Sequence, residues 1–441
     1  MIDRDTILPK VKKIPGPKAQ KFTRFSKKYM AISTLDEGFV WARDKPALGP
    51  WCTDIDGNII LDFVSHIASA PLGYNHPRIL EVMRKICAID PDRYAGTDFL
   101  ATYEKLDVPT PGHLHQKVVA ITKQFGFDTA FFSNSGAEAV ENAIKICYSA
   151  RKNDGYGICF EGAFHGRTLG ALSLNRSKAV QRTWYPHVPN IVDFPFCRCS
   201  GKCQCGWNTV SKKGTVENVL KQFFDKETGI EKPEEVSYVI IEPIQGEGGY
   251  RFPNKKFIRE VFREAQSRGI PVIADEIQSG LGRTGTWWAC EQYGVKPDVL
   301  TSAKALRVGA TISKKRMFPK EKGRISSTWA EGNAVASAVG YTTIVVIQKE
   351  RLLRNARVTG NYLLKRLREL GSVVDVRGIG LMDAIEFDTQ RMRNTIIERC
   401  LKNGLLLNSV GYKSIRFLPP LNVTKREIDV AVDILEKAMK A

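Results

Sequence analysis

The sequence predicts an α/β fold, in which a large central and mostly parallel sheet domain is joined to a smaller α+β domain built from both chain ends. Between about residues 115 and 310, short apolar segments alternate with segments of helical periodicity. The apolar segments lack the polar alternation of half-exposed strands, which indicates a sheet covered on both faces. The length of 441 residues suffices for two or three domains.

The first part of the chain precedes this alternating pattern. Residues 1–30 carry nine basic and two acidic side chains and are interrupted by prolines, which predicts a basic N-terminal arm. Residues 31–110 are expected to form the N-terminal part of the smaller domain. Within them, two apolar runs flank the turn Asp56-Gly57-Asn58, as in a pair of short strands.

The large domain is predicted over residues 111–335. Its expected strands are TAFFSNS, YGICFEGAF, VSYVIIEPI, PVIADEI and DVLTSAK. In the helix AEAVENAIKICYSARK, four apolar side chains share one face: Val140, Ala143, Ile144 and Cys147. Ligands of such sheets bind at the carboxyl ends of the strands, so the residues there are the candidates for chemistry.

Residues 336–441 are expected to complete the smaller domain. A long helical stretch, AVASAVGYTTIVVIQKERLLRNARV, starts this region and should connect it to the large domain. An α+β segment follows and ends in a helix over DVAVDILEKAMKA.

Composition and charge exclude several classes of protein. The chain is 43% hydrophobic and 26% charged, which is typical of a globular protein and not of a disordered or disulfide-stapled chain. Because no apolar run has the length of a membrane span and the N-terminal residues include no apolar stretch that could act as a secretory signal, we expect a cytoplasmic protein with no membrane partner. The net charge of +19 raises nucleic acid as a partner, but no RNA-binding or finger signature accompanies it, so we do not expect nucleic-acid binding.

Four of the ten cysteines are close together in sequence: Cys197, Cys199, Cys203 and Cys205. The spacing C-x-C-x3-C-x-C allows four thiolates around one zinc ion but departs from the commoner C-x2-C pairs. Two disulfides and four free thiols are open alternatives. We therefore assign no metal here, and any metal at this position would be structural.

Three segments carry groups that suit one cofactor. Residues 131–138 predict a strand, a turn of small residues and a helix start, where an anion can bind. Asp275 closes one apolar strand, and Lys304 closes the next. Pyridoxal 5′-phosphate requires a lysine for its Schiff base, a carboxylate at its pyridine nitrogen and a site for its phosphate. Purely structural roles are the alternatives: the small residues of the turn could simply form a tight connection, and Asp275 could cap a helix.

Seven motifs extend this interpretation. They are SNSGAEAVENAIK, FEGAFHGRTLGALSL, IIEPIQGEGGY, IADEIQSGLGRTG, the Lys304 strand, ISSTWAEGN and IRFLPPLNV. In order and spacing the chain resembles the class III (fold type I) pyridoxal-phosphate aminotransferases from about residue 30 to residue 440. The resemblance implies fold type I and transamination in two halves, in which an amino acid gives its amine to the cofactor and 2-oxoglutarate then receives it.

The resemblance also implies cofactor contacts. Lys304 and Asp275 would be the catalytic residues, one carrying the cofactor and the other binding its pyridine nitrogen. The other implied contacts are Ser135, Gly136 and Ala137 at the phosphate, Phe164 on the ring with His165 as a packed neighbour, Gln278 at the phenolic oxygen, and Thr328 at the partner subunit's phosphate. Thr328 therefore implies a homodimer with shared sites, and a tetramer of two dimers stays open.

Five further residues are implied to handle substrate: Ile67, Arg167, Glu242, Glu247 and Arg416. Arg167 resembles an arginine that binds the far carboxylate of ω-amino substrates. Arg416 resembles one that binds the α-carboxylate of 2-oxoglutarate in bidentate geometry. Glu247 matches a gate glutamate that pairs with Arg416 when that carboxylate is absent. Glu242 should anchor the site near the cofactor, and Ile67 should lie at the pocket rim.

The Glu247–Arg416 pair favours donors with a terminal amine. The segments IASAPLGYNHP, ALRVGA, ISSTWAEGN, RGIGLMDA and RFLPPL resemble the L-lysine 6-aminotransferase branch, so lysine or ornithine is the predicted donor. The stretch after Lys304 is poor in glycine, and His66 stands where a glycine is common, which weakens any transfer from the 4-aminobutyrate enzymes. A 4-aminobutyrate aminotransferase and an amino-acid racemase of the same family are the alternatives.

Overall fold

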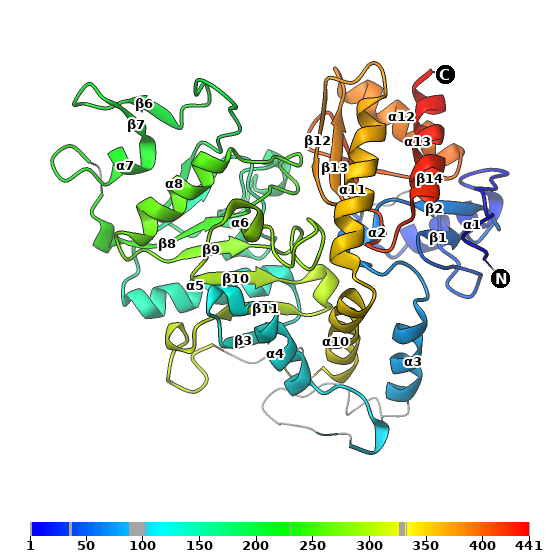
Figure 1. The fold of residues 1–441 in the computed structure, drawn as a ribbon, viewed down its shortest axis with the longest axis horizontal. Helices are drawn as coiled ribbons and strands as arrows, with labels where there is room; N and C mark the ends of the chain where they lie inside the picture. Colours follow the sequence, from blue (N-terminus) through cyan, green and yellow to red (C-terminus); the bar gives the residue numbers. More distant parts are fainter. Residues whose placement is uncertain are drawn as a thin grey trace. The chain divides into compact units, whose positions relative to one another are not determined.

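The computed structural model describes residues 2–34, 38–87, 102, 104–229, 231–325, 331 and 333–440. The chain divides into two compact units (Figure 1). The small unit comprises Met1–Leu80 with Arg351–Ala441, and the large unit comprises Glu81–Glu350. These divisions fall at 80/81 and 350/351, whereas the sequence analysis placed the domain boundaries at 110/111 and 335/336.

A seven-stranded sheet in the order β3-β11-β10-β9-β8-β4-β5 forms the centre of the large unit. Its strands are β3 (Thr129–Ser133), β4 (Tyr156–Phe160), β5 (Ile191–Phe194), β8 (Val236–Ile241), β9 (Val272–Asp275), β10 (Val299–Ser302) and β11 (Gly309–Ser313). β11 pairs antiparallel with β3 and β10, and the other pairs are parallel. The predicted α/β fold with a mostly parallel sheet is therefore confirmed.

Two strands of this sheet were missed by the sequence analysis. β5 is an edge strand with only Phe194 fully buried, so its apolar run is short. β11, with the sequence GATIS, is buried throughout but contains a single large aliphatic side chain, Ile312. Neither strand has the run of large apolar residues that marks a buried strand.

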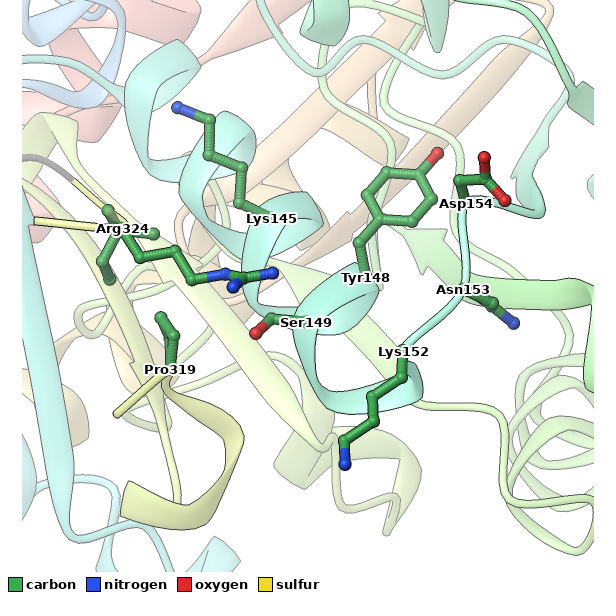
Figure 2. A pocket seen from close by; sticks show the side chains of 9 residues that line it. Lys145, Tyr148, Ser149, Lys152, Asn153, Asp154, Pro319 and Arg324 are labelled. Carbon is green, nitrogen blue, oxygen red and sulfur yellow. The ribbon is translucent and has the colours of Figure 1, made fainter. Parts of the chain in front are cut away.

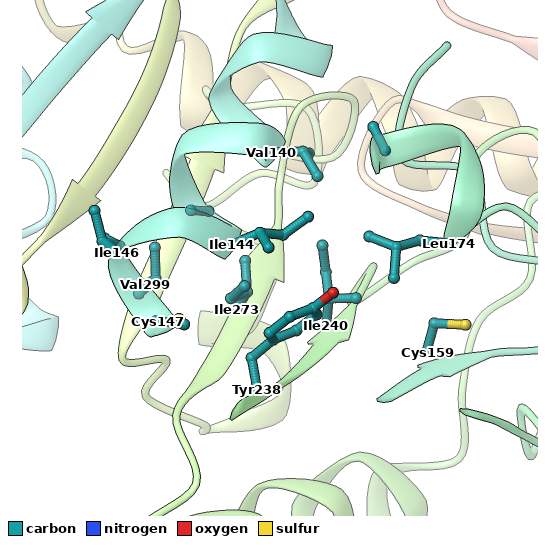
Figure 3. Close-up of a cluster of buried hydrophobic side chains, with 12 residues drawn as sticks. Val140, Ile144, Ile146, Cys147, Cys159, Leu174, Tyr238, Ile240, Ile273 and Val299 are labelled. Carbon is teal, nitrogen blue, oxygen red and sulfur yellow. The ribbon is translucent and has the colours of Figure 1, made fainter. Parts of the chain in front are cut away.

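Helices cover both faces of the large sheet. On one face, α5 (Gly136–Arg151) packs against β4, β8, β9 and β10 in a buried cluster (Figure 3). Cys159 of β4 belongs to that cluster, whereas the next residue, Phe160, contacts Phe257 of α8 (Lys255–Gln266) with ring centroids 5.6 Å apart. Successive side chains of a strand point to opposite faces, so α8 covers the other face.

The predicted long helical stretch after residue 330 is two helices. α10 (Ala334–Lys349) ends beside Glu350, and α11 (Leu352–Arg368) begins after Arg351, whose φ of +53° is left-handed. This break coincides with the division between the two units. The break could not be predicted from the sequence, because neither a proline nor a glycine marks the position. The other elements of the large unit are α4 (Pro111–Ala120), α6 (Leu169–Ser173), β6 (Asn208–Val210), β7 (Val216–Asn218), α7 (Val219–Phe223) and α9 (Cys290–Tyr293).

The small unit contains two sheets, β1-β2-β14 and β12-β13-β16-β15. Their strands are β1 (Trp51–Thr53), β2 (Ile59–Asp62), β12 (Asp375–Ile379), β13 (Met382–Glu386), β14 (Leu405–Leu406), β15 (Asn408–Val410) and β16 (Ser414–Phe417). The helices besides α11 are α1 (Pro17–Lys27), α2 (Ser65–Ala68), α12 (Gln390–Lys402) and α13 (Lys425–Lys440), while α3 (Pro77–Ile86) runs across the division. β14 pairs parallel with β2, so both chain ends share one sheet.

The basic N-terminal segment packs on the small unit. Arg4 forms an ion pair with Glu427 at 2.7 Å, and the other oxygen of this buried carboxylate accepts from Trp51 Nε1. The Asp56 carboxylate accepts from two backbone N–H groups in the first turn of α1. Within the described part of the chain, no helix combines the length and apolar character that crossing a membrane requires.

We predict that Ile273→Ala destabilises the protein by about 2–5 kcal/mol, because Ile273 is fully buried in the sheet core and truncation leaves a cavity. Urea denaturation followed by tryptophan fluorescence should show this loss. Ile32→Ala makes the same chemical change at a fully exposed side chain and should alter stability by less than about 0.5 kcal/mol. Equal losses in both variants would contradict the assignment of Ile273 to the core.

Candidate active site

The carboxyl ends of β9 and β10 bring two predicted residues to neighbouring positions. Asp275 is the last residue of β9 and lies opposite Thr301 in the parallel ladder with β10. Lys304 follows β10 and opens a short 3-10 helix that ends at Leu306. The φ of Lys304 is +39°, a conformation that costs a non-glycine residue on the order of 1 kcal/mol. Such strained positions are concentrated at functional sites.

Both oxygens of the buried Asp275 carboxylate are held by hydrogen bonds. Oδ2 lies 2.7 Å from Nδ1 of His165, whose side chain is also buried. Oδ1 accepts from the Thr301 hydroxyl at 3.2 Å and from the Ile277 backbone N–H at 3.1 Å. The sequence motifs predicted His165 only as a packed neighbour of the ring, without a contact to Asp275. No local sequence pattern indicates this contact, because the two residues lie 110 positions apart.

A second buried carboxylate, Glu242, lies at the end of β8. Its two oxygens accept from the backbone N–H groups of Phe164 at 2.9 Å and Gly246 at 2.8 Å. Burial raises the pKa of Glu242 to about 7; His165 opposes this shift, and the charge of Asp275 adds to it. Glu242 therefore ties the segment around Phe164 to the loop that carries Glu247.

The predicted phosphate-binding turn lies at the N-terminus of α5. The Ser135 hydroxyl accepts from the Glu138 backbone N–H at 3.2 Å and caps the helix, and Gly136 and Ala137 form its first turn. The backbone is closely packed here, because a Cβ on Gly136 would lie 2.8 Å from an Ile277 side-chain carbon. A helix N-terminus of this length offers N–H groups and a favourable dipole to an anion such as a phosphate.

Two glycines that the sequence analysis did not single out help to form this turn. A Cβ on Gly166 would lie 2.7 Å from Cβ of Ala137, and Gly166 has a φ of +145°. A Cβ on Gly309, at the start of β11, would lie 2.1 Å from the carbonyl oxygen of Ser135. Any side chain at either position would displace the turn, so glycine is required at both.

The other predicted residues of the large unit that the structure describes are Gln278, Arg167 and Glu247. Among the described residues, the buried Gln278 Oε1 and His165 Nε2 have no hydrogen-bond partner, and both would be satisfied by a polar bound group. Arg167 is exposed, and its guanidinium lies 5.9 Å from the centroid of the half-buried Phe164 ring. Glu247 is largely buried, and its carboxylate lies 3.8 Å from Lys178 Nζ. The unpartnered atoms of Gln278 and His165, together with Asp275 and Lys304, fit the polar groups of pyridoxal 5′-phosphate.

Two predicted substrate residues belong to the small unit. Arg416 is buried on β16, where its Nη2 donates to Asn408 Oδ1 at 3.3 Å. Ile67 lies in α2, which is a left-handed turn because all four of its residues have positive φ. The buried Asp62 carboxylate accepts from the Val64 backbone N–H at 2.7 Å and helps to hold this turn. Thr328 lies outside the described residues.

A separate cavity of about 600 Å³ lies at the far end of α5 (Figure 2). Lys145, Lys152 and Arg324 contribute its positive charge, beside Tyr148 and Asp154. Lys152 is the C-cap of α5, where a cation complements the negative end of the helix dipole. None of the predicted site residues lines this cavity, so it is distinct from the candidate active site.

The chain is similar to known proteins over nearly its whole length. The family model for class III aminotransferases matches residues 39–439. An alanine/serine racemase from Pyrococcus horikoshii is 30% identical, over 98% of this chain and 92% of the relative. An acetylornithine aminotransferase from Archaeoglobus fulgidus is 33% identical, over 88% of this chain and 92% of the relative.

A solved structure agrees with these relatives. The lysine aminotransferase from M. tuberculosis in its internal aldimine form superimposes with a TM-score of 0.81 at 26% identity, covering 96% of this chain and 99% of that chain. The resemblance to fold type I enzymes noted in the sequence motifs is therefore confirmed. The chain belongs to the class III aminotransferases, enzymes that depend on pyridoxal 5′-phosphate.

Proposed function

We propose that the protein transfers the terminal amine of an ω-amino acid, with lysine or ornithine favoured, to 2-oxoglutarate and so produces a semialdehyde and glutamate. The observation that carries the proposal is the Asp275 carboxylate, buried and held by His165 at a strand end beside the strand that leads to Lys304. The choice of donor is supported by similarity to the acetylornithine and lysine aminotransferases.

The residues of the large unit would divide the work of transamination. Bound pyridoxal 5′-phosphate supplies an electron sink that stabilises negative charge on the substrate carbon. Asp275 is placed to hold a proton on the pyridine nitrogen, and the Lys304 amine is the group that would take a proton from the substrate carbon and return it. The N-terminus of α5, with Ser135 and Gly136, would hold the phosphate.

The two buried carboxylates would have different roles. Hydrogen bonds from the Thr301 hydroxyl and the Ile277 backbone N–H hold the Asp275 carboxylate in place. Burial, with a smaller contribution from the nearby charge of Asp275, raises the pKa of Glu242 to about 7, although His165 opposes the shift. Near neutral pH, Glu242 can therefore hold a proton, whereas Asp275 is the carboxylate placed to face the pyridine nitrogen.

The arginines and Glu247 would select the two substrates. The planar guanidinium of Arg416 suits bidentate binding of the 2-oxoglutarate α-carboxylate, and exposed Arg167 suits the far carboxylate of the amine donor. Glu247 would pair with Arg416 while the amine donor is bound. Lys178, at 3.8 Å, offers Glu247 a second cationic partner when 2-oxoglutarate displaces it. Thr328 would reach the phosphate of the partner subunit in a homodimer.

A racemase is the second candidate, because the alanine/serine racemase from P. horikoshii is similar over 98% of this chain. The two functions differ in their need for an acceptor. A transaminase consumes a 2-oxo acid in every cycle, whereas a racemase returns the amine to the same carbon and needs none.

The donor is identified by visible spectroscopy of the holoenzyme with L-lysine, L-ornithine or 4-aminobutyrate added separately. We expect lysine or ornithine to bleach the cofactor band and 2-oxoglutarate to restore it, because the two half-reactions run in sequence. Bleaching only by 4-aminobutyrate would favour that alternative donor. An unchanged band with all three, together with interconversion of alanine enantiomers, would favour the racemase.

Two lysine variants provide the controls for this experiment. Lys304→Ala removes the amine that carries the cofactor and moves the proton. The variant should therefore show no bleaching, and its transaminase activity should fall by about 10³-fold or more. Lys145→Ala changes an exposed lysine of α5 and should leave both unchanged. Normal bleaching of Lys304→Ala would contradict the assigned role.

His165 should act as a positioning residue for Asp275. We predict that His165→Phe weakens pyridoxal 5′-phosphate binding by about 10–100-fold, because the carboxylate loses a partner at 2.7 Å. His165→Asn retains an N–H donor and should recover most of the affinity. Titration of the apoenzyme with cofactor measures both. If the two variants lose thermal stability equally but bind cofactor normally, His165 has only a packing role.

Glu242 should make stability depend on pH. The pKa of Glu242 in the folded protein, about 7, lies above its ordinary value of 4.5. The contribution of Glu242 to the free energy of unfolding is therefore full below pH 4.5 and is lost as the pH rises through 7. Between pH 5 and pH 8, the free energy of unfolding of the wild type should therefore fall by about 2–3 kcal/mol more than that of Glu242→Gln. Urea denaturation of both proteins at the two pH values measures this difference. Equal pH dependence in the two proteins would rule out the shift.

A further inference from the structure

The four cysteines that lie close together in sequence also meet in space. The Sγ atoms of Cys197, Cys199, Cys203 and Cys205, here called the four-cysteine cluster, all lie within 4.8 Å of one another. All four are free thiols. The cluster belongs to the segment between β5 and β6 of the large unit, and the transamination chemistry proposed above does not use it.

The distances fit one shared metal ion. Tetrahedral coordination with a zinc–sulfur distance of about 2.3 Å places the sulfurs about 3.8 Å apart. Sγ of Cys203 and Sγ of Cys205 lie 3.5 Å apart, and every other pair is within 4.8 Å. Two disulfides would require only that the sulfurs lie close in two separate pairs. They would not require all four sulfurs to lie at one point. In a two-iron cluster, the sulfurs on opposite irons would be farther apart than this.

The backbone around the cluster suits thiolate ligands. The Asn208 backbone N–H donates to Sγ of Cys203 at 3.4 Å, the kind of contact that supports metal-bound thiolates. Gly206 directly follows Cys205 with a φ of +83°, so the chain can turn immediately after this ligand.

The segment has little apolar side-chain surface of its own to bury. Residues 198–206, with the sequence RCSGKCQCG, contain no large apolar side chain that could form a core. The hairpin that follows exposes Val210 and Val216. A segment that cannot bury enough apolar surface commonly depends on a metal or a disulfide for its structure.

Contacts on both sides of the cluster join it to α8. The Cys197 carbonyl accepts from the backbone N–H of Asn254 at 2.9 Å, and Asn254 caps the N-terminus of α8. On the other side, the fully buried Trp207 donates to Glu260 at 2.9 Å and packs on Phe257, with ring centroids 4.6 Å apart. An ion in the cluster would therefore fix the loop against the start and the buried face of α8.

From these contacts we propose that the four-cysteine cluster binds one zinc ion as a structural site. Four protein thiolates fill a tetrahedral shell and leave no position for a substrate or a water molecule. Zinc is the ion that such closed sites hold most often, because its filled d shell imposes no competing geometry. The site is independent of the proposed donor and of the proposed reaction.

Metal analysis of the purified full-length holoenzyme tests the site directly. We expect one zinc per chain by inductively coupled plasma mass spectrometry, retained after dialysis and released when a mercurial reagent modifies the thiols. Cys199→Ser should reduce the zinc content at least about tenfold, because a serine hydroxyl is a much poorer ligand. Cys87→Ser, which removes an exposed thiol outside the cluster, should retain one zinc per chain.

A second measurement decides the question if Cys199→Ser does not fold. Wild-type protein produced with cobalt should show tetrahedral cobalt–thiolate bands in the red, where the cofactor does not absorb. Metal-free protein whose thiols react with iodoacetamide only after reduction would overturn the proposal in favour of disulfides. Iron in place of zinc, or zinc that Cys199→Ser and Cys87→Ser lose equally, would also overturn it.

Discussion

The buried charge of Asp275 is the constraint on which the arrangement of the site depends. A carboxylate removed from water is tolerated only when hydrogen bonds and charges compensate for its lost hydration. His165, Thr301 and the Ile277 backbone provide that compensation from three separate segments. The position of this one group therefore fixes the ends of β9 and β10 and the segment around Phe164 relative to one another.

Most of the fold could be predicted because its strongest sequence signals are buried strands. Five strands of the large sheet lie in predominantly apolar segments, and a helical face such as that of α5 has a clear period. The predictions failed where tertiary contacts override local pattern. β11 is held by strands on both sides although GATIS has one large aliphatic side chain. The break at Arg351 and the left-handed turn at Ile67 also involve ordinary residues in a conformation that no local sequence signal marks.

The candidate site was partly predictable for a related reason. Asp275 and Lys304 follow apolar strands, and the carboxyl ends of parallel strands meet at one edge, so local sequence placed both in the site. The contact between His165 and Asp275 is not local, since it depends on how β4 and β9 are ordered in the sheet. The need for glycine at positions 166 and 309 arises from packing against Ala137 and Ser135, which only the folded chain shows.

The parallel pairing of β14 with β2 has a consequence for synthesis on the ribosome. The large unit is one continuous stretch, Glu81–Glu350, and can fold as soon as it emerges. The small unit cannot complete its sheet until Leu405 and Leu406 have been translated, and Glu427, the partner of Arg4, follows later still. The N-terminal segment must therefore wait, partly exposed, while more than three hundred residues are added to the chain.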